Sequence, residues 1–272
     1  MKIIKHNLMA VSGHVIDQKP SNNVGRILTP ECLVMHYTAG SSAKSAIDWL
    51  CNPASKASAH LVIGRDGSVT QLVPFNRQAW HAGRSQWQGR TGLNQYSIGI
   101  ELDNAGILSG GPGKWRTAWG AAIMDKDVLE LPHKFDGVVR GWHTYTSAQL
   151  DTAREVAALL VAEYALKDVI GHDDIAPGRK TDPGPAFPMA SFRAAVMGRA
   201  DDAPEIWVTT SYVNLRTGPG TENKKVMTRP LPAGIRVTLL AEHGVWRQVD
   251  VLDMVEGEMD LVGWVHGRYL QR

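Results

Sequence analysis

The stretch "ECLVMHYTAGSSAKSAIDWLCN", residues 31–52, contains the patterns of two kinds of secondary structure. Residues 31–40 have the pattern of an apolar strand that ends in a turn of small residues. Residues 41–52 have the pattern of a short helix with a serine cap, and this helix is expected to stop at Pro53. Its apolar positions are Ala46, Ile47, Trp49 and Leu50. A strand followed directly by a helix predicts a domain that mixes α and β structure.

Three further elements support the same class of domain. The clearest is a hairpin over 58–74, "SAHLVIGRDGSVTQLVP", in which two β-type runs flank Asp66-Gly67, a dipeptide suited to a tight turn. Another strand is expected in "YSIGIELD", residues 96–103. The strongest helical pattern lies in residues 144–166, where the capping-box pattern Thr146-x-x-Gln149 precedes a periodic apolar run.

Residues 105–141 show neither the helical nor the strand period. We therefore expect a long excursion, and long loops in compact domains are usually functional or mobile. The excursion contains Trp115 and Trp119. Two interpretations of these side chains stay open: they stack on sugar rings, or they pin the loop to its domain.

The sequence changes character near residue 205. Residues 206–272 consist of short β-like runs separated by turn residues, which predicts a small all-β module. We expect a hinge near 201–205, a main domain over 1–200 and the module over 205–272.

The composition is that of an ordinary globular protein. Of 272 residues, 43% are hydrophobic and 21% are charged, which is enough for a substantial core. The net charge of +2 comes without a dense block of lysine or arginine, so we expect no nucleic-acid partner. Cys32 and Cys51 alone cannot form a disulfide framework, and we expect reduced thiols.

Two histidines and one aspartate have the spacing of a metal site. His36 ends an apolar strand, His172 follows a short strand, and Asp182 lies between turns rich in glycine and proline. Two imidazoles and one carboxylate suit Zn²⁺ with a fourth position left for water. The alternative is that each histidine is a hydrogen-bonded structural residue. Glu101 is likewise either a surface acid or a carboxylate in a cleft, and Lys180 by itself is only one half of a surface ion pair.

Five motifs occur in an order that resembles a known family. They are "MHYTAG", "SAHLVIGRDGSVTQLVP", "AWHAG", "NQYSIGIEL" and "GHDDIAPGRKTDPGPAF", within about residues 28–198. The chain resembles the zinc-dependent N-acetylmuramoyl-L-alanine amidases of amidase type 2, which are related to phage lysozyme-type amidases and peptidoglycan recognition proteins. The resemblance implies a central mixed β-sheet flanked by helices and one Zn²⁺ per chain.

The resemblance also implies roles for individual residues. His36, His172 and Asp182 match the three zinc ligands of the family. Glu101 matches the position that helps to activate the metal-bound water, and Lys180 matches the residue that stabilises the tetrahedral intermediate.

Three residues are expected at the substrate: His81, Trp80 and His60. The resemblance implies that His60 and His81 either line the cleft or support the metal site from behind. His81 is the better candidate for substrate contact, with Trp80 shaping the wall beside it. For His60, a structural hydrogen bond within a strand stays open as the alternative.

The C-terminal module resembles a bacterial SH3 domain, on the basis of Asn214-Leu215-Arg216, Trp246 and Gly263-Trp264-Val265. Such modules often bind cell-wall peptide, and a passive appendage is the alternative.

We therefore expect a peptidoglycan hydrolase that cleaves the amide between the lactyl group of N-acetylmuramic acid and L-alanine of the stem peptide. The alternatives are a peptidoglycan-binding recognition protein with little or no hydrolysis and, more distantly, another zinc amide hydrolase. The expected partner is peptidoglycan or a muropeptide, and the sequence does not indicate an oligomeric state.

The start "MKIIKHNLMAVSGHVIDQ" lacks the apolar core of a secretory signal, and nowhere are there about 20 consecutive apolar residues of a membrane helix. We expect no membrane span and a chain that is cytoplasmic as synthesised. Action on the wall after lysis or non-Sec export stays open.

Overall fold

The computed structural model describes residues 1–11, 16–198, 206–258 and 261–272. Contacts within the chain divide it into two compact units, which consist of Met1–Gly106 with Ala148–Gly184 and of Ile107–Ser147 with Pro185–Arg272. The hinge predicted at 201–205 falls outside the described residues. The division into 1–200 and 205–272 therefore stays a prediction.

Within the described residues, the first unit is built on a mixed six-stranded sheet. In spatial order its strands are β15 (Asp168–Gly171), β5 (Cys32–Tyr37), β11 (Ser97–Leu102), β6 (Leu61–Ile63), β7 (Val69–Gln71) and β3 (Ile16–Gln18). The first four strands are parallel, β7 runs antiparallel to β6, and β3 is parallel to β7. The predicted central mixed sheet is confirmed.

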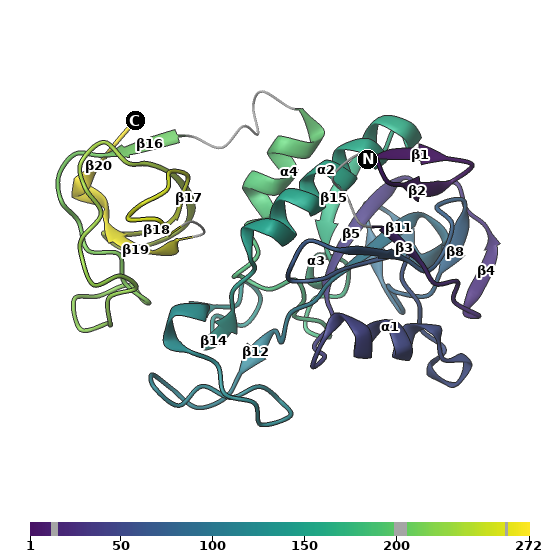
Figure 1. Ribbon diagram of the computed structural model, residues 1–272, viewed down its shortest axis with the longest axis horizontal. Helices are drawn as coiled ribbons and strands as arrows, with labels where there is room; N and C mark the ends of the chain where they lie inside the picture. Colours follow the sequence, from purple (N-terminus) through teal and green to yellow (C-terminus); the bar gives the residue numbers. More distant parts are fainter. Residues whose placement is uncertain (12–15, 199–205, 259–260) are drawn as a thin grey trace. The chain divides into compact units, whose positions relative to one another are not determined.

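Helices lie on either side of this sheet (Figure 1). Helix α1 (Ala43–Cys51) begins at a Ser42 cap and buries Ala46 and Leu50. Leu50 belongs to an apolar cluster that includes Val62 of β6. Helix α2 (Ser147–Tyr164) buries an apolar stripe made of Leu150, Ala153, Val156, Ala157 and Leu160. Because both helices are amphipathic, each covers one face of the sheet and leaves its polar side in water. No helix in the described ranges combines the length and apolar character that a membrane crossing needs.

The expected hairpin at 58–74 is confirmed. Its strands β6 and β7 pair antiparallel, and Gly67 adopts a φ of 81° in the turn, a value that favours glycine. The unit is completed by short elements: β1 (Lys2–Ile4), β2 (Asn7–Met9), β4 (Val24–Ile27), β8 (Arg77–Ala79), β9 (Gln86–Trp87), β10 (Arg90–Thr91) and α3 (His172–Ile175).

The excursion predicted at 105–141 contains regular structure, so the expectation of an aperiodic loop was wrong. Its strands β12 (Ile107–Leu108), β14 (Val139–His143) and β13 (Val128–Pro132) form an antiparallel sheet in that order. Strand β13 buries Val128, Leu129 and Leu131. It therefore lacks the alternation of apolar and polar residues that marks a strand with one face in solvent. Trp115 is buried, and a Cβ on Gly141 of β14 would lie 2.3 Å from its ring, so Trp115 packs within the excursion itself.

The C-terminal residues form a separate sheet, which is antiparallel throughout. Its strands are, in spatial order, β19 (Val262–His266), β18 (Trp246–Val251), β17 (Arg236–His243), β16 (Ile206–Thr209) and β20 (Leu270–Gln271). Leu215, Leu231, Val237, Val249 and Val265 lie at the centre of its apolar core. Helix α4 (Met189–Met197) precedes it in the chain. A sheet-rich module is consistent with the SH3-like prediction, which stays a prediction.

Candidate active site

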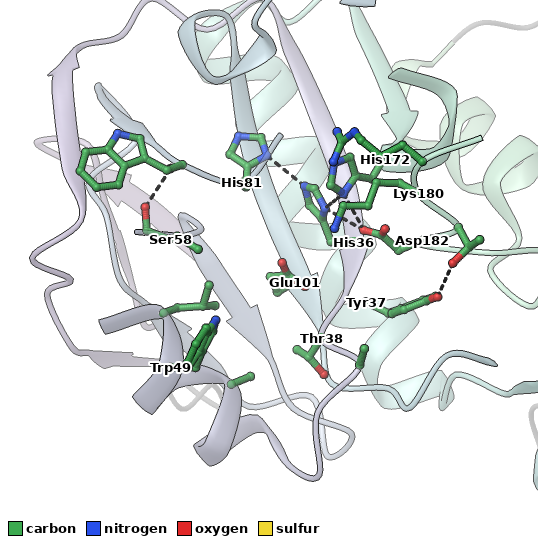
Figure 2. A pocket seen from close by; sticks show the side chains of 17 residues that line it. His36, Tyr37, Thr38, Trp49, Ser58, His81, Glu101, His172, Lys180 and Asp182 are labelled. Atoms are coloured by element: carbon green, nitrogen blue, oxygen red, sulfur yellow. Dashed lines mark hydrogen bonds and ion pairs between the residues drawn. The ribbon is translucent and has the colours of Figure 1, made fainter. Parts of the chain in front are cut away.

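Three neighbouring parallel strands bring the predicted site residues to one edge of the sheet. His36 lies near the end of β5, and its partner in the parallel register of β11 is Glu101. Gly171, the last residue of β15, pairs with Met35, so that His172 follows β15 one register step further, beside His36. Parallel strands present their carboxyl ends at the same edge, and ligands of such sheets bind there. Figure 2 shows the resulting group of side chains.

His36, His172 and Asp182 converge on one point. The Nδ1 atoms of the two histidines are 2.9 Å apart, and each lies 2.9 Å from Oδ2 of Asp182. The three residues are almost completely buried, with exposed fractions of 1%, 3% and 6%. In the part of the chain that the structure describes, these three residues are the group with the geometry of a metal site.

The donor atoms fit a metal ion better than they fit hydrogen bonds alone. Hydrogen bonds cannot join all three pairs of these atoms at once. Each imidazole Nδ1 either carries a hydrogen and donates or lacks one and accepts, and the carboxylate oxygen only accepts. Donors at tetrahedral zinc distances would lie about 3.3 Å apart, close to the observed spacing. Two imidazole nitrogens and one carboxylate oxygen are also ligands that Zn²⁺ accepts.

The protonation states of these side chains favour metal binding. Burial, together with the neighbouring His172, lowers the pKa of His36 to about 4, which leaves its imidazole neutral near pH 7. Burial raises the pKa of Asp182, but hydrogen bonds to His172 and His36 outweigh burial and hold it well below its ordinary value. Metal ligands must be deprotonated, so His36 and Asp182 need to release no proton.

Glu101 lies beside this cluster with an unsatisfied oxygen. Its Oε2 atom is buried and has no hydrogen-bond partner within the described residues, although it belongs to the wall of a cavity. Burial raises the pKa of Glu101 well above its ordinary value, and the charge of Asp182 raises it further. An unpaired buried carboxylate is costly, and such a group in a cleft is a candidate for proton transfer.

Lys180 lines the same cavity on the loop between His172 and Asp182. Its backbone N–H donates to the carbonyl oxygen of Ala176 over 3.0 Å, which fixes the turn. Its ammonium group forms no ion pair within 4.0 Å in the described part of the chain. A cation that is held near the metal cluster without a partner is available to a bound anion or to a developing oxyanion.

Three hydrogen bonds hold this loop against the segment between β8 and β9 and against β5. The guanidinium of Arg179 donates to the carbonyl oxygens of Ala82 and Arg84, over 3.0 Å and 2.7 Å. The hydroxyl of Tyr37, the residue after His36, lies 2.7 Å from Oγ1 of Thr181. Thr181 separates Lys180 from Asp182, so the bond to Tyr37 ties this part of the loop to β5.

The cavity has a volume of about 380 Å³ and belongs entirely to the first unit. Its wall combines the metal cluster, Glu101 and Lys180 with an apolar part contributed by α1 and by Trp80. A concave site with a few convergent polar groups is the usual form of a small-molecule or peptide site.

A family model described as N-acetylmuramoyl-L-alanine amidase, Amidase_2, matches residues 27–185. The chain belongs to this amidase family. The matched range contains all three residues of the metal cluster together with Glu101 and Lys180, so the family assignment and the site rest on the same part of the molecule.

Two curated relatives come from Escherichia coli (strain K12). The 1,6-anhydro-N-acetylmuramyl-L-alanine amidase AmpD is 39% identical over 143 residues, which cover 52% of this chain and 59% of AmpD. The N-acetylmuramoyl-L-alanine amidase AmiD is 32% identical over 183 residues, which cover 64% of this chain and 56% of AmiD. The chain thus spans less than two thirds of the length of either curated relative.

A crystal structure of a selenomethionine derivative of AmpD has the same fold. It superimposes with a TM-score of 0.50 and 30% sequence identity, and it covers 72% of this chain and 99% of its own. This agreement confirms the mixed sheet flanked by helices as the fold of the amidase family.

His81, a predicted substrate residue, lines the cavity and also contacts the Nε2 side of His36. Its Nδ1 lies 2.9 Å from Nε2 of His36, and its Nε2 lies 3.4 Å from the carbonyl oxygen of Ser97. If Nδ1 of His36 presents its lone pair to a metal, Nε2 of His36 donates to His81, and His81 in turn donates to Ser97. Such partners fix the tautomer and orientation of ligating histidines. Gly99 permits this packing, because a Cβ there would lie 2.4 Å from the His81 ring.

The other two predicted substrate residues differ from each other in position. Trp80 lines the cavity. His60 is completely buried and outside the cavity wall, with Nε2 2.9 Å from the carbonyl oxygen of Arg77. Its Nδ1 accepts the N–H of Gly99 over 3.0 Å, so both ring nitrogens are used. This position favours the structural alternative for His60.

Trp49, Tyr37 and Arg179 also line the cavity, although the sequence pattern did not single them out as site residues. Tyr37 and Arg179 stand next to motif residues that were singled out, namely His36 and Lys180. Trp49 belonged to the predicted apolar face of its helix, yet its side chain is 60% exposed. The exposure of a side chain distinguishes a core residue from a residue of a cavity wall, and this exposure is known only from the folded structure.

Proposed function

We propose that this chain is a zinc-dependent hydrolase that cleaves the amide between the lactyl group of N-acetylmuramic acid and L-alanine of the stem peptide. The observation that carries the proposal is one cavity that contains three convergent metal donors, a buried carboxyl oxygen and an ammonium group, the last two without a partner among the described residues. The names of the relatives AmpD and AmiD support the substrate class, because both are muramyl-L-alanine amidases.

His36, His172 and Asp182 would hold the zinc ion. When bound in such a site, Zn²⁺ lowers the pKa of a water ligand toward 7 and polarises a carbonyl oxygen. A set of two histidines and one carboxylate also suits Fe²⁺, and family membership is what favours zinc here. Metal analysis of the purified chain distinguishes the two ions.

Glu101 would move the proton. Its Oε2 accepts a proton from the water that attacks the amide carbon, and it then delivers this proton to the departing nitrogen of L-alanine. Efficient proton transfer requires a pKa near the working pH, and burial moves the pKa of Glu101 in that direction. A carboxyl oxygen with no competing hydrogen bond is free to face the reacting atoms.

Lys180 would meet the charge that develops on the amide oxygen. As the carbon becomes tetrahedral, its oxygen gains negative charge, and a preorganised cation stabilises that charge. The braces through Arg179 and Tyr37 hold the loop of Lys180 in place before substrate binds. Little reorganisation is then needed at the moment of reaction.

Release of stem peptide from purified muropeptides tests the proposal. The zinc-loaded chain should release peptide with a free L-alanine amino group, and a chelator should abolish the release until Zn²⁺ is restored. Binding of muropeptides without any release would instead support a recognition protein. Soluble anhydro-muropeptides and muropeptides with an intact reducing sugar, assayed side by side, would show which form is preferred.

For the C-terminal residues we propose an SH3-like module over 205–272 that binds cell-wall peptide, alongside an amidase domain over 1–200. The antiparallel five-stranded sheet supports an all-β module of this kind. Binding of the whole chain to intact sacculi, compared with soluble muropeptides, tests this proposal. A preference for sacculi supports a wall-binding module, and equal binding supports a passive appendage.

A further inference from the structure

Helix α1 carries a large aromatic side chain that the core does not use. Ala46 and Leu50 of this helix are buried, whereas Trp49 is 60% exposed and contributes to the cavity wall. Exposed apolar side chains that occur singly need no explanation. Trp49 differs because its exposed surface faces the same cavity as the metal cluster, and a capped helix holds it there.

The surroundings of Trp49 give this end of the cavity its chemistry. Leu50, Ala57 and Trp80 line the cavity with it, and all are apolar. The Ser58 hydroxyl nearby is already engaged, since it donates to the carbonyl oxygen of Asn23 and accepts the N–H of Trp80. This part of the wall therefore offers apolar surface for van der Waals contact and, among its described residues, no charged group for an ion pair.

The charged groups of the cavity lie elsewhere. Figure 2 shows Trp49 separated from Lys180 and the metal cluster, with Glu101 between them in that view. A substrate whose scissile amide sits at Glu101 and Lys180 would extend one of its flanking parts toward Trp49. That part would be uncharged and rich in C–H groups, because the wall around Trp49 is apolar and an indole gains from contact with such a surface.

We propose that Trp49 is a specificity-determining residue, whose indole covers an uncharged, C–H-rich part of the substrate next to the scissile amide. This inference rests on the proposed amidase function and deepens it. Two parts of a muropeptide present that chemistry: the face of the pyranose ring and the aliphatic portion of the stem peptide. Because Trp49 stands away from the reacting groups, its contact would be equally strong before and during the reaction. Loss of such uniform binding raises KM and leaves kcat unchanged.

The test compares Trp49→Ala, Trp49→Phe and Ile27→Ala in the zinc-loaded full chain on a muramyl tripeptide. Ile27 is a matched control, since it is 78% exposed in the same unit and lies outside the cavity wall. Trp49→Ala should raise KM about tenfold with kcat within about twofold, the effect of losing one well-placed aromatic contact. Trp49→Phe keeps an aromatic ring and should stay within about threefold of the wild-type KM.

Two shortened substrates identify what the indole covers. N-lactoyl tripeptide lacks the sugar, and muramyl-L-alanine lacks the rest of the stem. If Trp49 contacts the pyranose ring, the effect of Trp49→Ala disappears with the lactoyl peptide. If it contacts the stem peptide, the effect disappears with muramyl-L-alanine.

Three outcomes would overturn the inference. The first is an unchanged KM in Trp49→Ala, as in Ile27→Ala. The second is an equal loss on all three substrates, and the third is a fall in zinc content, both of which would indicate a structural role for Trp49. A wild-type chain that released no peptide from any muropeptide would refute the proposed function itself, and the inference would fail with it.

Discussion

Glu101→Gln changes one buried group without changing its shape, and two different effects should follow. The variant retains His36, His172 and Asp182, so its zinc content should match that of the wild type. It cannot accept a proton, and general-base catalysis contributes about 10²- to 10⁴-fold to rates. We expect kcat for peptide release to fall by at least about 100-fold.

The same substitution should stabilise the metal-free chain at neutral pH. Burial holds the pKa of Glu101 above its unfolded value, so the folded chain binds this proton more tightly than the unfolded chain does. Relative to an uncharged side chain, Glu101 therefore lowers stability at neutral pH, and this penalty disappears as the pH falls through the folded pKa toward about 4.3. We expect Glu101→Gln to raise the free energy of unfolding by about 1 kcal/mol or more near pH 8. Near pH 4 it should have little effect.

Denaturant unfolding of the chelator-treated chain at several pH values measures this difference, and peptide release from the zinc-loaded chain measures the rate. Glu163→Gln is the matched control, because Glu163 is an exposed acid of the same unit. The control should change neither quantity. A Glu101→Gln variant that retains more than a third of the activity, or that is less stable than the wild type near pH 8, would refute the reasoning.

Three further substitutions separate the roles within the site. Asp182→Asn should lose most of the bound zinc by metal analysis, because a weaker neutral ligand replaces the carboxylate; full zinc content would contradict its place in the metal cluster. Lys180→Met should keep the metal and lower kcat/KM about 100-fold in the release assay, and a loss of zinc as complete as in Asp182→Asn would contradict its separate role. His81→Phe should weaken zinc binding about 10- to 100-fold in a chelator competition, whereas unchanged affinity would show that His36 needs no hydrogen bond from behind.

Local patterns predicted the elements whose formation depends on neighbouring residues. The Asp66-Gly67 turn specified the hairpin of β6 and β7, and the serine cap specified the start of α1. The ordered motifs also predicted the mixed sheet, because residues near the carboxyl ends of parallel strands carry the site. Local patterns did not predict the strands of the excursion 105–141, since β13 buries adjacent side chains and shows no alternation of buried and exposed residues.

The parts of the site that escaped prediction depend on contacts between distant segments. The contact of His81 with His36 requires that the segment after β8 pack on β11, the neighbour of β5 in the sheet. No pattern within one segment predicts this arrangement. Trp49 has the spacing of a core residue on its helix, and only the tertiary arrangement turns it toward a cavity. The pairing of Tyr37 with Thr181 likewise joins residues 144 positions apart.

The central claim is that His36, His172 and Asp182 hold a catalytic zinc ion. A titration of the metal-free chain with Zn²⁺, followed by release of stem peptide from a muropeptide, tests it most directly. Release should be absent without metal, should rise in proportion to added Zn²⁺ and should reach its plateau at about one ion per chain. Full release from a chain shown by metal analysis to contain no metal, or no release at one bound zinc ion per chain, would contradict the claim.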